Sequence, residues 1–62
     1  MAFNIKLLTA IKNKNWTQRK LAERIKIHES EISKIINRGM EPDKSTKRSI
    51  ARALGVKIKE IF

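Results

Sequence analysis

The chain has 62 residues, no cysteine and a formal net charge of +9, from 15 Lys and Arg against 6 Asp and Glu. This length allows one domain, residues 1–62, with a small core, and the lack of cysteine excludes disulfides and thiolate metal sites. No apolar run approaches the ~20 residues that cross a membrane and no signal peptide is evident, so we expect a cytoplasmic protein. The positive charge, carried by both halves of the chain, favours nucleic acid as partner.

The first helix is predicted over residues 1–13, where apolar side chains recur at helical spacing. Its apolar face is made by Phe3, Leu7, Leu8 and Ile11. Asn15 follows the helix and can take the left-handed conformation common at helix C-termini. A lone Trp at position 16 is more often a core anchor than a platform for stacked bases, and we expect the anchor.

Two short amphipathic helices joined by a tight turn are predicted next. Thr17 is a good N-cap for the earlier one, and the later one should run over residues 29–37. Their apolar stripes are Leu21, Ala22 and Ile25 in one and Ile32, Ile35 and Ile36 in the other. The small Ala22 allows the two helices to cross closely. This is the layout of a helix-turn-helix, whose second helix enters the major groove of DNA.

The remainder of the chain predicts two further helices. Residues 38–42 contain Gly and Pro and should form a loop. Asp43 is an expected N-cap for a fourth helix that runs through Leu54 and ends at Gly55. A short apolar helix then closes the sequence with Val56, Ile58, Ile61 and Phe62. We find no internal repeat or linker. Because all five predicted elements are helices, we expect an all-α fold, a compact five-helix domain.

Several residues stand at a spacing typical of one family. They are Thr17-Gln18, Leu21-Ala22, Ile32-Ser33 with Ile35, Pro42, and the closing Ile50-Ala51-Arg52-Ala53-Leu54-Gly55-Val56 with Glu60-Ile61-Phe62. From about Leu7 to Phe62 the chain therefore resembles the lambda-repressor/Cro-like (XRE-type) helix-turn-helix family. The resemblance implies a lambda-repressor-like DNA-binding domain that binds a pseudo-palindromic operator as a homodimer.

The chain departs from the family pattern at three glycines. Asn15, Lys26 and Arg38 stand where relatives usually have Gly. A left-handed Lys26 would cost about 1–2 kcal/mol, whereas Asn15 is a tolerable substitute. The loop glycine is displaced to Gly39, which predicts that the third helix ends one residue away from the usual position.

Four other family positions are changed in character. A buried Arg–Glu pair of the family falls on Ile11 and Ile36, which we predict to pack together, because a well-packed apolar pair can replace a buried ion pair. Lys44 and Lys47 occupy places that are usually apolar, which makes the start of the fourth helix more basic.

The residues predicted to contact DNA are Thr17, Gln18, Arg19, His28, Glu29, Ser30, Ser33, Lys34, Asn37, Arg38 and Lys44. The resemblance implies that Gln18 lies against a phosphate and that Glu29, Ser30 and Lys34 face base edges. Lys34 can donate to O6 and N7 of guanine, but it can also contact a phosphate. Glu29 can accept from a cytosine amino group, or it can simply favour the positive end of the helix dipole. The supporting phosphate contacts are expected from Arg19, Lys20, Arg38, Lys44 and Lys47.

An enzyme is not expected, because His28 has no nucleophile near it and the chain has neither a Gly-rich phosphate loop nor metal-ligand spacing. No cofactor, metal, membrane or small-molecule ligand is indicated. We expect a sequence-specific DNA-binding transcriptional regulator, a bacterial or phage repressor, acting as a homodimer on double-stranded DNA. The candidate dimer interface is Ile58, Ile61 and Phe62, although the same residues could simply seal the core.

Two alternatives stay open. One is a DNA-binding antitoxin-like module whose main partner is another protein, such as a toxin. The other is a non-specific cationic binder of nucleic acid. We see no segment beyond the helix-turn-helix domain that would grip a toxin, and the amphipathic pattern of every helix would have no purpose in a non-specific binder. Both observations favour the simple regulator.

Overall fold

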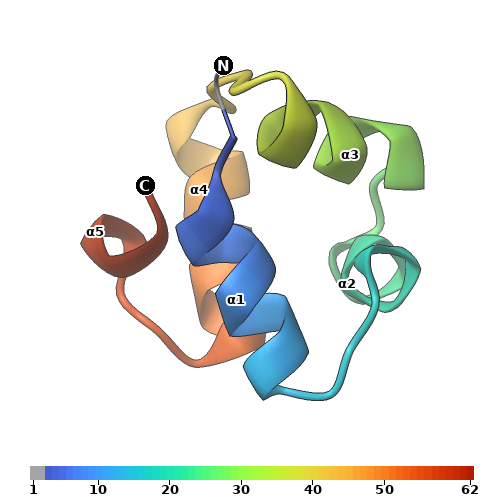
Figure 1. Cartoon of the computed structure of the whole chain (residues 1–62), viewed down its shortest axis with the longest axis vertical. Coiled ribbons are helices and arrows are strands. Elements are labelled where there is room, and N and C mark those ends of the chain that lie inside the picture. The colour runs from blue at the N-terminus through green and yellow to red at the C-terminus, as the bar shows by residue number, and fades with distance from the viewer. Residues whose placement is uncertain (1–2) are drawn as a thin grey trace.

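The computed structural model describes residues 3–62, and within them it contains five α-helices and no strand (Figure 1). The helices are α1 (Ile5–Asn13), α2 (Gln18–Ile25), α3 (Glu29–Asn37), α4 (Lys44–Leu54) and α5 (Ile58–Ile61). α2 packs on both α3 and α4, while α5 packs against α4 and α1. The predicted all-α class and the five-helix arrangement are therefore confirmed.

Asn4 fixes the start of α1 through three hydrogen bonds. Its side-chain Oδ1 accepts from the backbone N–H of Leu7 at 3.0 Å, which caps the helix. Its Nδ2 donates to the carbonyl of Ile61 at 2.8 Å, and its backbone N–H donates to the carbonyl of Ile36, also at 2.8 Å. Asn4 thus joins the first helix to the last turn of α3 and to α5.

The prediction that the first helix extends over residues 1–13 is wrong at its beginning, since α1 starts at Ile5. Phe3 does not extend the apolar face of α1, because it precedes the cap and is 52% exposed. The sequence pattern could not locate this boundary because the capping asparagine interrupts an apolar run. Residues 1–2 lie outside the described part of the chain.

The other predicted caps are present. Thr17 accepts from the backbone N–H of Lys20 at 3.1 Å, and Asp43 accepts from that of Thr46 at 2.8 Å. Hydrogen bonds from the Thr46 hydroxyl and backbone lower the pKa of Asp43 below its ordinary value. Because that pKa is lowered, the cap stabilises α4 above the ordinary carboxyl pKa, and this contribution disappears as the pH falls through the lowered one. Gly55 ends α4 with φ of 70°.

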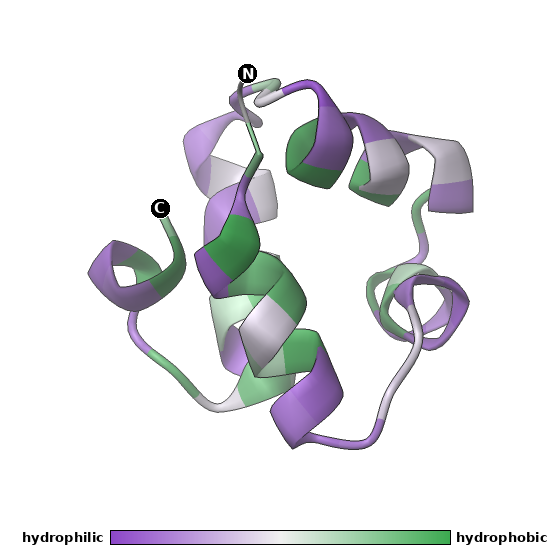
Figure 2. Cartoon of the chain, viewed as in Figure 1, coloured by the Kyte–Doolittle hydropathy of each residue, from purple (hydrophilic) through white to green (hydrophobic). Residues whose placement is uncertain are grey.

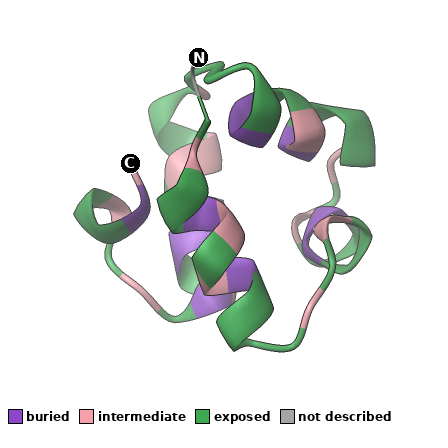
Figure 3. Ribbon diagram, viewed as in Figure 1, coloured by how far each residue is buried: buried purple, intermediate pink, exposed green. Residues whose placement is uncertain are grey.

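The core is built from one apolar face of each helix. Its fully buried side chains are Leu7, Ile11, Leu21, Ile32, Ile35, Ile36, Ile50 and Ile61. Figure 2 shows the hydrophobic faces turned inward, and Figure 3 shows that the buried residues follow them. Ile11 and Ile36 are each 1% exposed and belong to the same core cluster, where α1 contacts α3. Both isoleucines are thus buried in the apolar core, on the two helices that the prediction brought together.

Two residues other than glycine adopt left-handed backbone conformations. They are Asn15, with φ of 60°, and Lys26, with φ of 61°. Lys26 is the C-cap of α2, where its conformation turns the chain toward α3. At the end of α3, Arg38 stays right-handed and Gly39 takes the positive φ of 64°. The left-handed residue after α3 is therefore the glycine at position 39, one residue beyond the C-cap Arg38.

Replacing Lys26 by Gly should stabilise the protein. Lys26→Gly removes a left-handed penalty of about 1–2 kcal/mol, which is partly offset by the greater freedom of Gly in the unfolded chain. We expect the free energy of unfolding in urea to rise by about 0.5–1 kcal/mol.

The control is Lys20→Gly, at an exposed position inside α2 with ordinary helical backbone. It should destabilise the protein by about 1 kcal/mol. Equal losses of stability in both variants would show that the left-handed conformation of Lys26 costs nothing.

Candidate nucleic-acid interface

The turn between α2 and α3 sets the direction of the third helix. After Lys26 reverses the chain, Ile27 donates its backbone N–H to the carbonyl of Ala22 at 3.0 Å and packs its side chain against the core. Ala22 is 2% exposed, so its small side chain lies within the contact region of α2. The predicted helix-turn-helix is present, and its second helix has the predicted bounds.

One face of α3 is buried and the opposite face is free. Ile32, Ile35 and Ile36 are each at most 1% exposed. The outer face carries side chains that the sequence predicted to meet DNA, namely Glu29, Ser30, Ser33, Lys34, Asn37 and Arg38. All of these are exposed except Ser33, which is half-buried. Five of them, Ser30, Ser33, Lys34, Asn37 and Arg38, line one shallow depression.

Within this outer face, two side chains are oriented by each other. Nδ2 of Asn37 donates to Oγ of Ser33 at 3.0 Å, one helical turn away. This hydrogen bond does not use the carboxamide oxygen of Asn37 or the hydroxyl hydrogen of Ser33. The pair therefore offers one acceptor and one donor beside the flexible ammonium group of Lys34.

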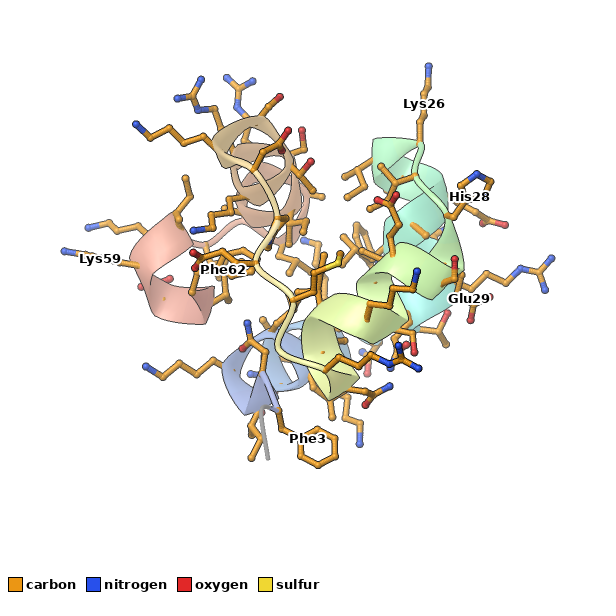
Figure 4. The ribbon with its side chains drawn as sticks, turned by 90° about the horizontal axis from the view of Figure 1, so that it is seen from above. Phe3, Lys26, His28, Glu29, Lys59 and Phe62 are labelled. Atoms are coloured by element: carbon orange, nitrogen blue, oxygen red, sulfur yellow. The ribbon has the colours of Figure 1, made fainter. Side chains whose placement is uncertain are left out.

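The N-terminal end of α3 is acidic. His28 is the N-cap residue but makes no side-chain cap hydrogen bond, and Glu29 and Glu31 stand in the first turn. Figure 4 shows His28 and Glu29 at the outer edge of the molecule, with their side chains directed to solvent. Acidic side chains here interact favourably with the positive end of the helix dipole. The exposed carboxylate of Glu29 is also able to accept a hydrogen bond from a cytosine amino group.

The start of α2 lies on the flank of the predicted interface. The hydroxyl of Thr17 is used as the helix cap, while Gln18 is half-buried at the first helical position. Nε of Arg19 lies 3.6 Å from Oε2 of Glu23, with both side chains largely exposed. A pair this exposed is worth about 0–1 kcal/mol, so it does not prevent Arg19 from moving to a phosphate.

The two lysines of α4 differ in their surroundings. Lys44 is the first residue of the helix and is exposed. Lys47 has a side chain only 21% exposed, and its Nζ lies 3.1 Å from Oε1 of Glu41 and 5.5 Å from the centre of the Phe62 ring. It therefore ties the loop before α4 to the end of the chain. The ammonium group of Lys47 is therefore engaged within the protein, whereas Lys44 is exposed at the start of the helix.

The sequence contained a signal for this difference. Both lysines replace residues that are usually apolar, but only position 47 is turned toward the packed side of α4. There the aliphatic stem of Lys47 takes the place of an apolar side chain and its charge is paired at the surface. Spacing along α4 relative to Ile50, Ala51 and Leu54 would have identified it.

Trp16 has the role of a core anchor. Its side chain is half-buried and packs against the core cluster. Two cationic groups also lie near its ring, with Nζ of Lys14 at 5.3 Å and Cζ of Arg24 at 5.4 Å from the ring centre. Sequence reasoning missed these two cation–π contacts, which depend on how the loop between α1 and α2 folds back on α2.

Within residues 3–62, no group of three or more His, Cys, Asp or Glu side chains is placed to hold a metal ion. None of the helices in this part of the chain has the length and apolar character needed to cross a membrane.

The fold and the exposed face of α3 define a helix-turn-helix protein. Residues 7–61 match the model of a helix-turn-helix family, so the chain belongs to the XRE-type, lambda-repressor-like family. The match spans the region that the sequence analysis assigned to it. Neither the curated proteins nor the solved structures include a match to this chain. Membership in the family makes the protein a DNA-binding regulator of the XRE type.

Removing Lys34 and removing Lys44 should have different effects on DNA binding. Lys34→Ala should weaken binding to the preferred site by about 1–3 kcal/mol and relax selectivity at one base pair. Lys44→Ala should weaken all sequences alike and reduce the slope of log K against log salt by about one. Both affinities can be measured by fluorescence anisotropy on preferred and random duplexes.

Each lysine variant is the control for the other, because both lose one charge from an exposed helix position. If the two variants behave identically on preferred and random DNA, the outer face of α3 does not read bases.

Proposed function

We propose that the protein is a sequence-specific transcriptional regulator, a repressor of bacterial or phage type, that inserts α3 into the major groove of its operator. The observation that carries this proposal is the polar outer face of α3, which stands opposite the buried stripe of Ile32, Ile35 and Ile36. Gln18 and Lys44 flank that face at the starts of α2 and α4 and would contact the backbone on either side.

The distribution of charge supports a division of labour between helices. α3 carries two acidic residues and one lysine, so it adds no net attraction for DNA. α4 carries four basic residues and no acidic one. In this proposal the cations of α2 and α4 provide affinity, while α3 provides selectivity, and its acidic side chains repel sequences that do not offer them a donor.

We further propose that the protein binds DNA as a homodimer through an apolar surface around its C-terminus. Of the three candidate residues, Ile61 is 2% exposed and belongs to the core, whereas Ile58 and Phe62 are half-buried. Phe3, Ile5 and Met40, which sequence reasoning missed, are 52%, 65% and 41% exposed. These three and Phe62 line one hollow of about 430 Å³. A second copy would cover this apolar surface.

The position of this surface suits a two-fold complex. Phe62 and Lys59 lie on the opposite side of the molecule from His28 and Glu29 (Figure 4). The Cα trace spans 26 × 22 × 22 Å. Two copies in contact can therefore place their α3 helices in successive major grooves, which lie roughly 34–36 Å apart.

Selection of bound sequences from a random DNA pool at fixed salt tests the proposed function. We expect an enriched site with two related halves one helical turn apart. A pool that stays unenriched while the protein binds it would support the non-specific cationic binder. If the protein instead held a protein partner tightly and retained no DNA from the pool, the antitoxin-like alternative would be supported.

A charge placed in the apolar surface should disrupt the dimer. We expect Ile5→Glu to remain folded, because an acid in the first turn of α1 favours the helix dipole. It should bind a duplex with two half-sites at least tenfold more weakly, while its affinity for a single half-site changes little. Gel-shift titrations on both duplexes and sedimentation velocity measure these effects.

Lys12→Ala is the matched control, since it lowers the net charge by the same amount from an exposed position on the same helix. Equal behaviour of Ile5→Glu and Lys12→Ala on both duplexes would exclude this surface as the dimer interface.

A further inference from the structure

A second cationic surface lies at the end of the molecule opposite α3. The residues lining its shallow hollow are Lys14, Trp16, Arg24, Arg52 and Ala53. In Figure 1, the loop between α1 and α2 and the C-terminal end of α4 are at the bottom of the view, whereas α3 is at the top. No lining residue of this hollow is shared with the depression on α3.

The three cations of this hollow come from the loop after α1, from α2 and from α4, and two of them lie over one ring. Lys14 and Arg24 lie 5.3 Å and 5.4 Å from the centre of the Trp16 ring, while Arg52 comes from α4. None of the three makes a salt bridge within residues 3–62, and no acidic residue lines the hollow. The three positive charges repel one another. An anion bound among them would be attracted by all three and would offset that repulsion.

The hollow continues into a basic stripe along α4. Lys44, Arg48 and Arg52 are exposed and spaced four residues apart, so they lie along one side of the helix. Within α4 the exposed residues beside them are Ser45 and Ser49, which carry no charge, and the one acidic neighbour is Asp43 at the N-cap before Lys44. The positive surface therefore extends from the flank of the α3 face to the far end of the protein.

We propose that this surface, formed by Lys14, Arg24 and Arg52 in the hollow beside Trp16 and continued along α4 by Arg48, is a second DNA-binding site that takes the phosphate backbone of another duplex. A repeating polyanion needs only such an array of cations, and each phosphate contact adds counterion release. A protein partner would need an apolar centre to its interface, and the apolar lining of this hollow is limited to Trp16 and Ala53. The ring of Trp16 is already engaged by two cations, so it is not free to stack on the bases of a single strand.

A protein with two such faces brings two stretches of DNA together. α3 holds one duplex by its major groove, while the second site binds the backbone of another duplex without regard to sequence. This activity is additional to operator recognition and does not depend on it, because binding at the second site requires no preferred sequence.

The test uses energy transfer between two short duplexes of random sequence, one carrying a donor dye and the other an acceptor. Added wild-type protein should produce transfer, because it bridges the two duplexes. The protein has a single Trp, so the indole N–H signal of Trp16 in a ¹⁵N NMR spectrum reports the second site directly. We expect that signal to shift on adding either duplex, separately from the side-chain amide signal of Asn37 on α3.

The site variant is Lys14→Gln with Arg24→Gln and Arg52→Gln. Its matched control is Lys12→Gln with Lys26→Gln and Lys57→Gln, which removes the same charge from exposed positions outside both the hollow and the proposed dimer surface. We expect the site variant to lose at least tenfold in bridging, and the salt slope of the bridging step to fall by about 2–3 for three lost phosphate contacts. The control should retain bridging.

Three results would overturn the proposal. Bridging by the site variant at the level of the control would mean that two α3 faces of a dimer join the duplexes. An unshifted Trp16 signal in wild-type protein saturated with duplex would exclude the hollow without any substitution. A Trp16 signal that shifts with poly-L-glutamate but not with duplex would assign the hollow to an acidic protein partner. The random-pool selection tests operator recognition separately.

Discussion

The burial of one isoleucine stripe on α3 is the constraint from which the rest of the structure follows. Ile32, Ile35 and Ile36 have almost no exposed surface, so the helix cannot rotate about its axis without exposing apolar area. Ser30, Ser33, Lys34 and Asn37 therefore have to face solvent. The polar face owes its position to the core beneath it, which is why a domain with so few residues can present a rigid polar surface on α3.

Two features hold this helix at its ends. At its start, the left-handed Lys26 and the half-buried Ile27, which packs against the core, fix the turn from α2. At its end, the carbonyl of Ile36 accepts from Asn4, which also caps α1 and bonds to Ile61. The orientation of α3 is thus coupled to both termini of the described chain, and a change around Asn4 would reach the reading face through this helix.

Much of this fold could be predicted from the sequence because its signals are local. The caps Thr17 and Asp43 and the helical spacing of apolar residues located α2, α3 and α4. The start of α1 could not be found in this way, since Asn4 is fixed by partners far away in sequence. The same limit applies to the site: the outer face of α3 follows from periodicity, whereas the pairing of Lys47 with Glu41 and the cations around Trp16 depend on tertiary packing.

The central claim, that the outer face of α3 enters the major groove, can be tested on the DNA itself. Methylation protection reports guanine N7, an atom that lies in the major groove. On a site enriched from the random pool, the account predicts protection of N7 in two clusters about one helical turn, roughly 34–36 Å, apart. Unprotected N7 atoms throughout a fully bound site, with only the backbone shielded, would contradict it.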